Sequence, residues 1–201
     1  MTIDNLKYIL PLLNFESGDD FYYLQILQRK KENPHLGSNS RVIKNYYIKS
    51  REYLEERYEE IKALCEMFNA RASLRLNKRS FEKTAYKALV NSANCMANRE
   101  YEFVGKAYDR AVGQGHNDKD KKWILDVDSR DFNINELVDY INTLQPEGDK
   151  IWTVLLSKSG YHIITRPFNL KDFKERYPEI EVHKDNPTNL YIPKENNNIN
   201  L

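Results

Sequence analysis

The strongest restriction on the fold comes from the order of strand and helix patterns between residues 122 and 192. Short apolar runs alternate there with segments in which apolar residues recur every three or four positions. The turn Lys158-Ser159-Gly160 joins two of the runs closely enough to make them antiparallel neighbours. The expected elements are strands at 122–128, 151–157, 161–166, 179–183 and 188–192, and helices at about 135–144 and 170–176.

The order strand-helix-strand-strand-helix-strand is typical of a ferredoxin-like or RRM-like unit, a four-stranded antiparallel sheet with its helices on one face. Residues 70–77 add an earlier strand, because apolar and polar residues alternate there and leave arginines on an outer face. Ser80 is expected to cap a helix that runs to about Arg99. Residues 111–121 are polar and contain glycine, which predicts a mobile connection.

The residues before this strand read as helical. Helices are expected at 4–14, at 19–31 and from about Arg41 to Phe68, with a loop at 32–40 that collects Pro, Gly, Ser and Asn. The sequence thus predicts an α+β protein with a helical N-terminal region at 1–69, an α/β core at 70–193 and a flexible tail at 194–201.

Composition is typical of a globular protein, and the lack of a long apolar run or a secretory signal pattern predicts a cytoplasmic one. Hydrophobic residues make up 40% and charged residues 30% of the 201 positions, and no apolar run approaches the length that spans a bilayer. The net charge of +1 argues neither for nor against nucleic acid. Cys65 and Cys95 lack a close Cys or His partner and are expected to be buried thiols.

Asp126 and Asp128 lie at the polar end of an apolar strand. Side chains alternate along a strand, so both carboxylates point the same way, with Cα atoms about 6 to 7 Å apart. Two carboxylates this close disfavour each other's ionised form unless a cation neutralises them. Mg²⁺ or Mn²⁺, completed by water and substrate phosphates, suits such a pair. The alternative is that the two aspartates merely end the strand.

The turn between the paired strands carries a second group of polar residues. Gly160 permits a tight turn whose N–H groups can approach an anion, and the Ser159 hydroxyl can donate a hydrogen bond. His162, near Lys158 and Arg166, can contact a phosphate or carry a proton. The alternative is an ordinary hairpin with an incidental histidine.

An apolar strand ending in D-x-D, followed after a helix by a hairpin reading S-G-Y-H, resembles the catalytic core of archaeo-eukaryotic primases. This superfamily includes primase-polymerases and phage replication proteins. The resemblance covers roughly residues 120 to 193. It implies that Asp126 and Asp128 hold divalent metal and that Ser159 and His162 contact the triphosphate of an incoming nucleotide.

The same resemblance implies a third acidic ligand on a later strand. Only Glu181 and Asp185 could supply it, and Asp185 is the predicted metal ligand alongside Asp126 and Asp128. Asn189, on the best-formed apolar strand of this region, is not acidic. His35, His116 and His183 match no motif and are expected on the surface.

A basic lining for nucleic acid is a further expectation. Arg71 and Arg75 share one strand face, and Arg79 extends the row; Arg29, Lys30 and Lys31 can add to it. The expected function is therefore a primase-like nucleotidyltransferase that acts on a nucleoside triphosphate and nucleic acid with Mg²⁺ or Mn²⁺. Two alternatives remain, a non-catalytic nucleic-acid-binding accessory protein of phage or mobile-element replication and a metal-dependent nuclease.

Overall fold

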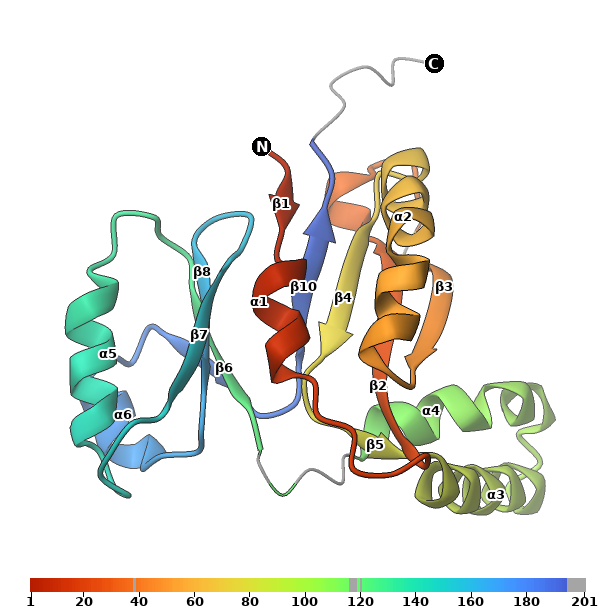
Figure 1. Cartoon of the computed structure of the whole chain (residues 1–201). Helices are drawn as coiled ribbons and strands as arrows, with labels where there is room; N and C mark the ends of the chain where they lie inside the picture. Colours follow the sequence, from red (N-terminus) through yellow and green to blue (C-terminus); the bar gives the residue numbers. More distant parts are fainter. Residues whose placement is uncertain (38, 116–118, 120, 195–201) are drawn as a thin grey trace.

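The structure, a computed structural model, describes residues 1–37, 39–115, 119 and 121–194. It is an α+β protein built on two antiparallel sheets, as the sequence predicts (Figure 1). His116 and the tail from residue 195 onward lie outside the described residues.

The larger sheet joins strands from both ends of the chain. Its order is β1-β10-β4-β2-β3, every neighbouring pair is antiparallel, and β5 pairs with β2. Because β10 lies between β1 and β4, the N-terminal and C-terminal segments run side by side (Figure 1). The strands are β1 (Ile3–Asp4), β2 (Asp20–Gln28), β3 (Arg41–Ile48), β4 (Arg71–Arg75), β5 (Arg79–Ser80) and β10 (Pro187–Ile192).

Helices α1 (Leu6–Ile9) and α2 (Arg51–Met67) cover one face of this sheet (Figure 1). A short 3-10 turn, η1 (Leu10–Leu12), follows α1. The Ser50 hydroxyl accepts a hydrogen bond from the backbone N–H of Tyr53 and so begins α2 as an N-cap. The helix buries a stripe against the sheet: Leu54, Tyr58, Ile61 and Cys65.

A second helical layer lies at the end of β2 and β5. It consists of α3 (Phe81–Ala97), the 3-10 helix η3 (Tyr101–Lys106) and α4 (Ala107–Gln114). Ser80 caps α3, since its hydroxyl accepts from the N–H of Lys83, as the sequence predicts. Val112 of α4 packs against the sheet residues Phe21 and Tyr23. A further 3-10 turn, η2 (Lys30–Glu32), follows β2.

The smaller sheet has the predicted strand-helix-strand-strand-helix-strand order. Its strands are arranged β7-β8-β6-β9, and all pairs are antiparallel. One face packs on α5 and α6, whose residues Leu137, Ile141 and Phe173 share a core with Leu125 and Val127 of β6. The elements are β6 (Trp123–Val127), α5 (Ile134–Thr143), β7 (Ile151–Leu156), β8 (Tyr161–Thr165), α6 (Leu170–Arg176) and β9 (Glu181–His183).

The opposite face of the smaller sheet packs toward the larger sheet. Ile124, Leu155 and Ile164 project there and belong to the same buried cluster as the core of the larger sheet. Because strand side chains alternate, Asp126 and His162 lie on this same face, two positions from Ile124 and Ile164. The candidate site therefore faces the junction of the two sheets.

Two segments of the predicted helical region are strands, so those predictions are wrong. Residues 20–28 form β2, which has sheet neighbours on both sides and is buried on both faces, so its apolar residues show no alternation that would mark a strand. Residues 41–48 form β3, and the helix predicted from Arg41 begins only at Arg51. The predicted boundary at 69/70 falls inside the larger sheet, because β4 pairs with β2.

Burial of the cysteines follows the prediction: both thiols are free and buried, and burial raises the pKa of Cys65 to about 12.

In the part of the chain that the structure describes, no helix combines the length and apolar character needed to cross a membrane.

Candidate functional site

A groove with a volume of about 960 Å³ lies where the two sheets meet. Ligand sites in proteins commonly enclose about 300 to 1,000 Å³, so this groove is large enough for a nucleotide-sized molecule. It gathers most of the residues that the sequence singles out. The smaller sheet and its hairpin contribute Asp126, Asp128, Lys158, Ser159, His162 and His183, and the other wall includes Leu27, Arg29, Lys31, Glu32, Arg71 and Asn189.

Asp126 and His162 form the central pair of the groove. They are direct cross-strand partners on β6 and β8, and His162 Nε2 lies 3.4 Å from Asp126 Oδ1. The other ring nitrogen, Nδ1, hydrogen-bonds to the buried Thr188 hydroxyl at 2.8 Å, which fixes the orientation of the ring. The hydrogen bond from His162 lowers the pKa of Asp126 despite its partial burial, so this carboxylate is ionised at neutral pH.

Asp128 lies just beyond the end of β6 and contacts the hairpin. The Ser159 hydroxyl donates a hydrogen bond to Asp128 Oδ1 over 2.6 Å. The structure thus joins the two predicted motifs directly, with Asp126 next to His162 and Asp128 next to Ser159.

Gly160 has a role that differs from the predicted one. Its N–H donates to the Ser157 hydroxyl at 3.0 Å and is not presented to an anion. A Cβ atom at this position would lie 1.9 Å from the carbonyl oxygen of Val127. Glycine is therefore required because the hairpin passes against the backbone at the end of β6, a close approach that holds Ser159 beside Asp128.

Glu181 and His183 of β9 lie on the other side of β6. Glu181 is the cross-strand partner of Asp126, and His183 is that of Ile124, so both project from the face that carries Asp126. Their side chains pair with each other, with His183 Nε2 3.2 Å from Glu181 Oε2. His183, expected to be an incidental surface residue, lines the groove. The alternation of side chains within residues 181–183 could have indicated that His183 lies on the face of Asp126. That inference requires knowing that β9 pairs with β6.

Asp185, the predicted third metal ligand, is used elsewhere. Its Oδ2 accepts from Arg79 at 2.7 Å and lies 3.4 Å from Arg75, and its Oδ1 accepts from Asn77 at 3.3 Å. The chain leaves β9 after His183 and turns toward β10 of the larger sheet, which carries Asp185 to these arginines. Asp185 is therefore not among the residues that line the groove, whereas Glu181 is the acid that lies beside Asp126.

Within the described residues, no group of three or more His, Cys, Asp or Glu side chains is arranged to hold a metal ion by itself. Mg²⁺ is usually held by one or two carboxylates, with water and substrate phosphates completing its coordination. Asp126 and Asp128 meet this lower requirement, because both line the groove and the pKa of Asp126 is lowered. The donor set therefore suits a cation that is bound together with a phosphate ligand.

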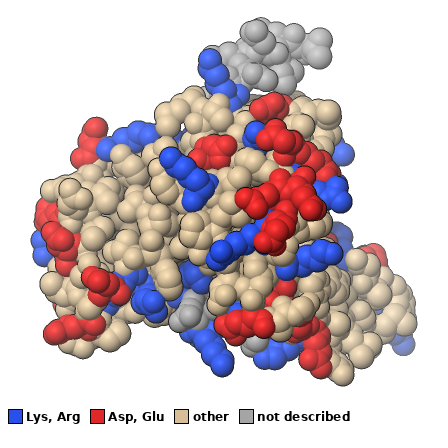
Figure 2. Space-filling model, viewed as in Figure 1, with Lys and Arg blue, Asp and Glu red and all other residues tan. Residues whose placement is uncertain are grey.

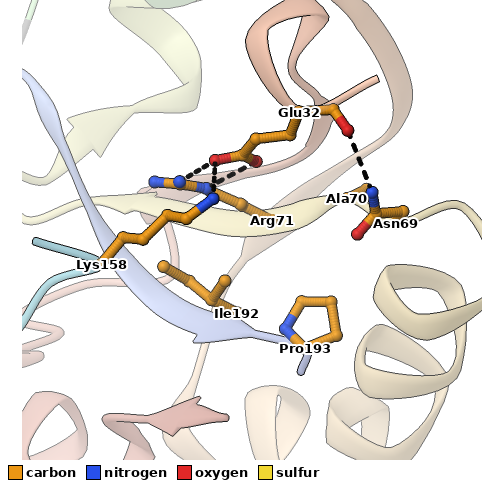
Figure 3. Close-up of a pocket in the computed structure, with 7 residues that line it drawn as sticks. All are labelled: Glu32, Asn69, Ala70, Arg71, Lys158, Ile192 and Pro193. Atoms are coloured by element: carbon orange, nitrogen blue, oxygen red, sulfur yellow. Dashed lines mark hydrogen bonds and ion pairs between the residues drawn. The ribbon is translucent and has the colours of Figure 1, made fainter. Parts of the chain in front are cut away.

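Two basic residues of the groove, Arg71 and Lys158, meet on one carboxylate. Figure 3 shows Arg71 and Lys158 converging on Glu32 from two sides. Arg71 comes from β4 and contacts both carboxylate oxygens, and Lys158 Nζ comes from the β7–β8 hairpin to within 3.3 Å of Oε1. Glu32 thereby links the two walls of the groove.

The three arginines that are predicted to form a basic lining are each paired with a carboxylate. Arg71 is buried against Glu32, and Arg75 and Arg79 share Asp185. Acidic side chains gather instead over α2, at the upper right of Figure 2, and elsewhere on that face the two signs are mixed. Arg166 lies beyond the far end of β8, where its guanidinium stacks 4.3 Å from the centre of the Trp152 ring, and it is not among the groove residues.

Comparison of the chain with protein-family models, with curated proteins and with solved structures found no match. The geometry of the groove is thus the basis for a functional assignment.

Proposed function

We propose that the groove binds a nucleoside triphosphate together with a nucleic-acid strand, and that the protein is a primase-like nucleotidyltransferase. The observation that carries this proposal is the meeting of two carboxylates with a histidine and a serine hydroxyl on one groove face, as Asp126–His162 and Asp128–Ser159. The order of these motifs along the chain resembles that of archaeo-eukaryotic primases.

In the proposed reaction, a 3′ hydroxyl of the strand attacks the α-phosphorus of the nucleotide and pyrophosphate leaves. Bound Mg²⁺ or Mn²⁺, held by Asp126 and Asp128, would lower the pKa of the attacking hydroxyl and neutralise the phosphate charge. Glu181, beside Asp126, adds a third carboxylate on the same face.

The protein's own groups then orient the phosphates. His162 is held by Thr188 through Nδ1, so its Nε2 is directed toward Asp126 and the groove, where it can donate to a phosphate oxygen. The Ser159 hydroxyl, bound to Asp128, lies in the same region. Arg29 and Lys31 add positive charge to the opposite wall of the groove.

A purely electrostatic nucleic-acid-binding role has less support. That role depends on the basic lining formed by Arg71, Arg75 and Arg79, and each of these arginines is paired with a carboxylate. A row that is already neutralised attracts a phosphate backbone only weakly.

The test is primer extension with a labelled nucleotide, a template and Mn²⁺. Asp126→Asn and Asp128→Asn keep the side-chain shape and remove the charge. Loss even of groups that merely support metal ligands costs roughly 10- to 100-fold, so each variant is expected to lose about 100-fold or more of the wild-type rate. Asp131→Asn is the matched control, because Asp131 is exposed and does not line the groove.

Equal extension by wild type and both groove variants would overturn the proposal. Shortened strands in place of extended ones would overturn it in favour of a nuclease, in which water replaces the 3′ hydroxyl.

A further inference from the structure

The ring of His162 is held by a residue of the other sheet. Its Nδ1 lies 2.8 Å from the hydroxyl of Thr188, which belongs to β10, whereas His162 belongs to β8. Thr188 is completely buried, and the His162 side chain is only 12% exposed. Water cannot easily replace this hydrogen bond, so the neighbouring protein groups determine which of the two atoms supplies the hydrogen.

The hydroxyl of Thr188 has one place to donate its hydrogen. A threonine hydroxyl carries one hydrogen and can also accept. Within the described residues, the only hydrogen-bond partner of this hydroxyl is His162 Nδ1. If Nδ1 carried a hydrogen and donated it, the hydrogen of the hydroxyl would be buried without an acceptor, which is unfavourable. The hydroxyl therefore donates and Nδ1 accepts.

Asp126 favours the same arrangement from the other side of the ring. His162 Nε2 lies 3.4 Å from Asp126 Oδ1, and this carboxylate is ionised and can only accept, so the contact is favourable when Nε2 carries the hydrogen. The contact is longer than the roughly 2.7 to 3.2 Å of an ordinary N–H···O hydrogen bond. Thr188 therefore makes the closer contact with the ring, and the hydrogen on Nε2 is available to an oxygen atom that approaches more closely.

We propose that Thr188 is a positioning residue that keeps the hydrogen of the neutral His162 ring on Nε2. His162 then donates to a phosphate oxygen of the substrate and is not the base that takes the proton of the attacking hydroxyl, because a ring nitrogen that already carries a hydrogen accepts no proton. Nδ1 cannot be the base either, since the buried hydroxyl of Thr188 occupies it. The role toward phosphate rests on the proposed function, whereas the position of the hydrogen is a property of the free protein.

Long-range proton–nitrogen NMR correlation of the free full chain tests the position of the hydrogen. The spectra are recorded at a pH high enough that the ring resonances no longer change, and the His162 signals are identified by their absence in His162→Gln. In wild type, Nε2 is expected at the position of a protonated ring nitrogen and Nδ1 at that of an unprotonated one. Thr188→Val keeps the shape and removes the hydroxyl, so the Nδ1 signal should shift toward that of a nitrogen that accepts no hydrogen bond. Thr188→Ser should restore it.

Thr165→Val is the matched control. Thr165 is also completely buried and lies on β8 with His162, but its hydroxyl has no hydrogen-bond partner among the described residues. This variant should leave the His162 signals unchanged, and far-UV circular dichroism checks that all variants are folded. A hydrogen on Nδ1 of the wild type overturns the proposal. An unmoved Nδ1 signal in Thr188→Val, or an equal shift in Thr165→Val, also overturns it.

Primer extension tests the consequence for the reaction. Thr188→Val is expected to lose roughly 10-fold in kcat/KM for the nucleotide, the lower end of the range for residues that support a ligand, and Thr188→Ser should stay within about 3-fold of wild type. Equal loss in both variants would overturn the role of the hydroxyl. A wild type that extends no primer would overturn the proposed function instead, and the NMR spectra of the free protein would still decide where His162 carries its hydrogen.

Discussion

At Gly160 the hairpin passes within contact distance of the backbone at the end of β6, and this approach sets the distance between Ser159 and Asp128. Gly160→Ala would drive a methyl group into the Val127 carbonyl, so the backbone would have to move. The expected cost is roughly 2 kcal/mol or more in the free energy of unfolding, measured by urea denaturation.

The matched control is Gly113→Ala in α4, where a Cβ atom meets nothing within 4 Å. Alanine in a helix is favoured over glycine by roughly 0.5 to 1 kcal/mol, so this variant should be at least as stable as wild type. Equal stability of the two variants would contradict the close approach at Gly160.

The Asp126–His162 pair makes the stability of the protein depend on pH. The folded pKa of Asp126 lies below the ordinary value of 3.8, so the stability that this pair contributes is complete above that value. It is lost as the pH falls through the folded pKa. In His162→Ala the main cause of the lowering is gone, and the pKa of Asp126 should rise, as carboxyl-carbon NMR titration would show. An unchanged titration would mean that His162 does not act on this carboxylate.

Among the elements, the two chain segments that connect the sheets are tied together by the Asn77 side chain. The Asn77 side chain donates to the Lys122 and Lys184 carbonyl oxygens, both at 3.0 Å, and accepts from the Lys122 N–H at 2.7 Å. It thereby ties the chain entering β6 to the chain leaving β9. Asn77 is 1% exposed, so water cannot easily replace these bonds.

Asn77→Ala should therefore lower the free energy of unfolding by roughly 2 to 4 kcal/mol, since it leaves buried backbone groups without partners. Asn91→Ala is the comparison, because the side-chain hydrogen bonds of Asn91 are long, at 3.4 Å, and its loss should cost less than about 1 kcal/mol. Chemical denaturation measures the free energy of unfolding of both variants. Similar decreases in the two variants would contradict the proposed role of Asn77 in tying the two segments together.

The sequence could predict an element where a local pattern of residues defines it, and not where distant contacts do. The smaller sheet was predictable because local periodicity and a short hairpin define it. The positions of Asp126, Asp128, Ser159 and His162 at its strand end and hairpin were predictable for the same reason. The strand β2 was not, because burial on both faces removes the alternation that marks a strand. The pairings of Asp185 with Arg79 and of Glu32 with Arg71 join residues distant in sequence, and no local pattern encodes them.

In the whole molecule, the two sheets share one core. The cluster that contains Leu24 and Leu74 of the larger sheet also contains Ile124, Leu155 and Ile164 of the smaller one. We expect the protein to unfold in a single cooperative transition.

Its two tryptophans make this testable, since Trp123 and Trp152 both lie in the smaller sheet whereas far-UV circular dichroism reports on the whole chain. The fluorescence and dichroism midpoints should coincide in denaturant. Separate midpoints would show that the sheets unfold independently.

The position of β10 between β1 and β4 has a consequence for synthesis on the ribosome. The buried side chain of Asn5 donates to the carbonyl oxygen of Asn189, 184 residues later, so the first strand has no partner until translation has passed β10. The smaller sheet, by contrast, is contiguous from β6 to β9 and can form as soon as those residues emerge. Strands β2, β3 and β4 form antiparallel pairs within residues 20–75 and emerge earlier still, so assembly during translation is expected to begin with them and to add β1 last.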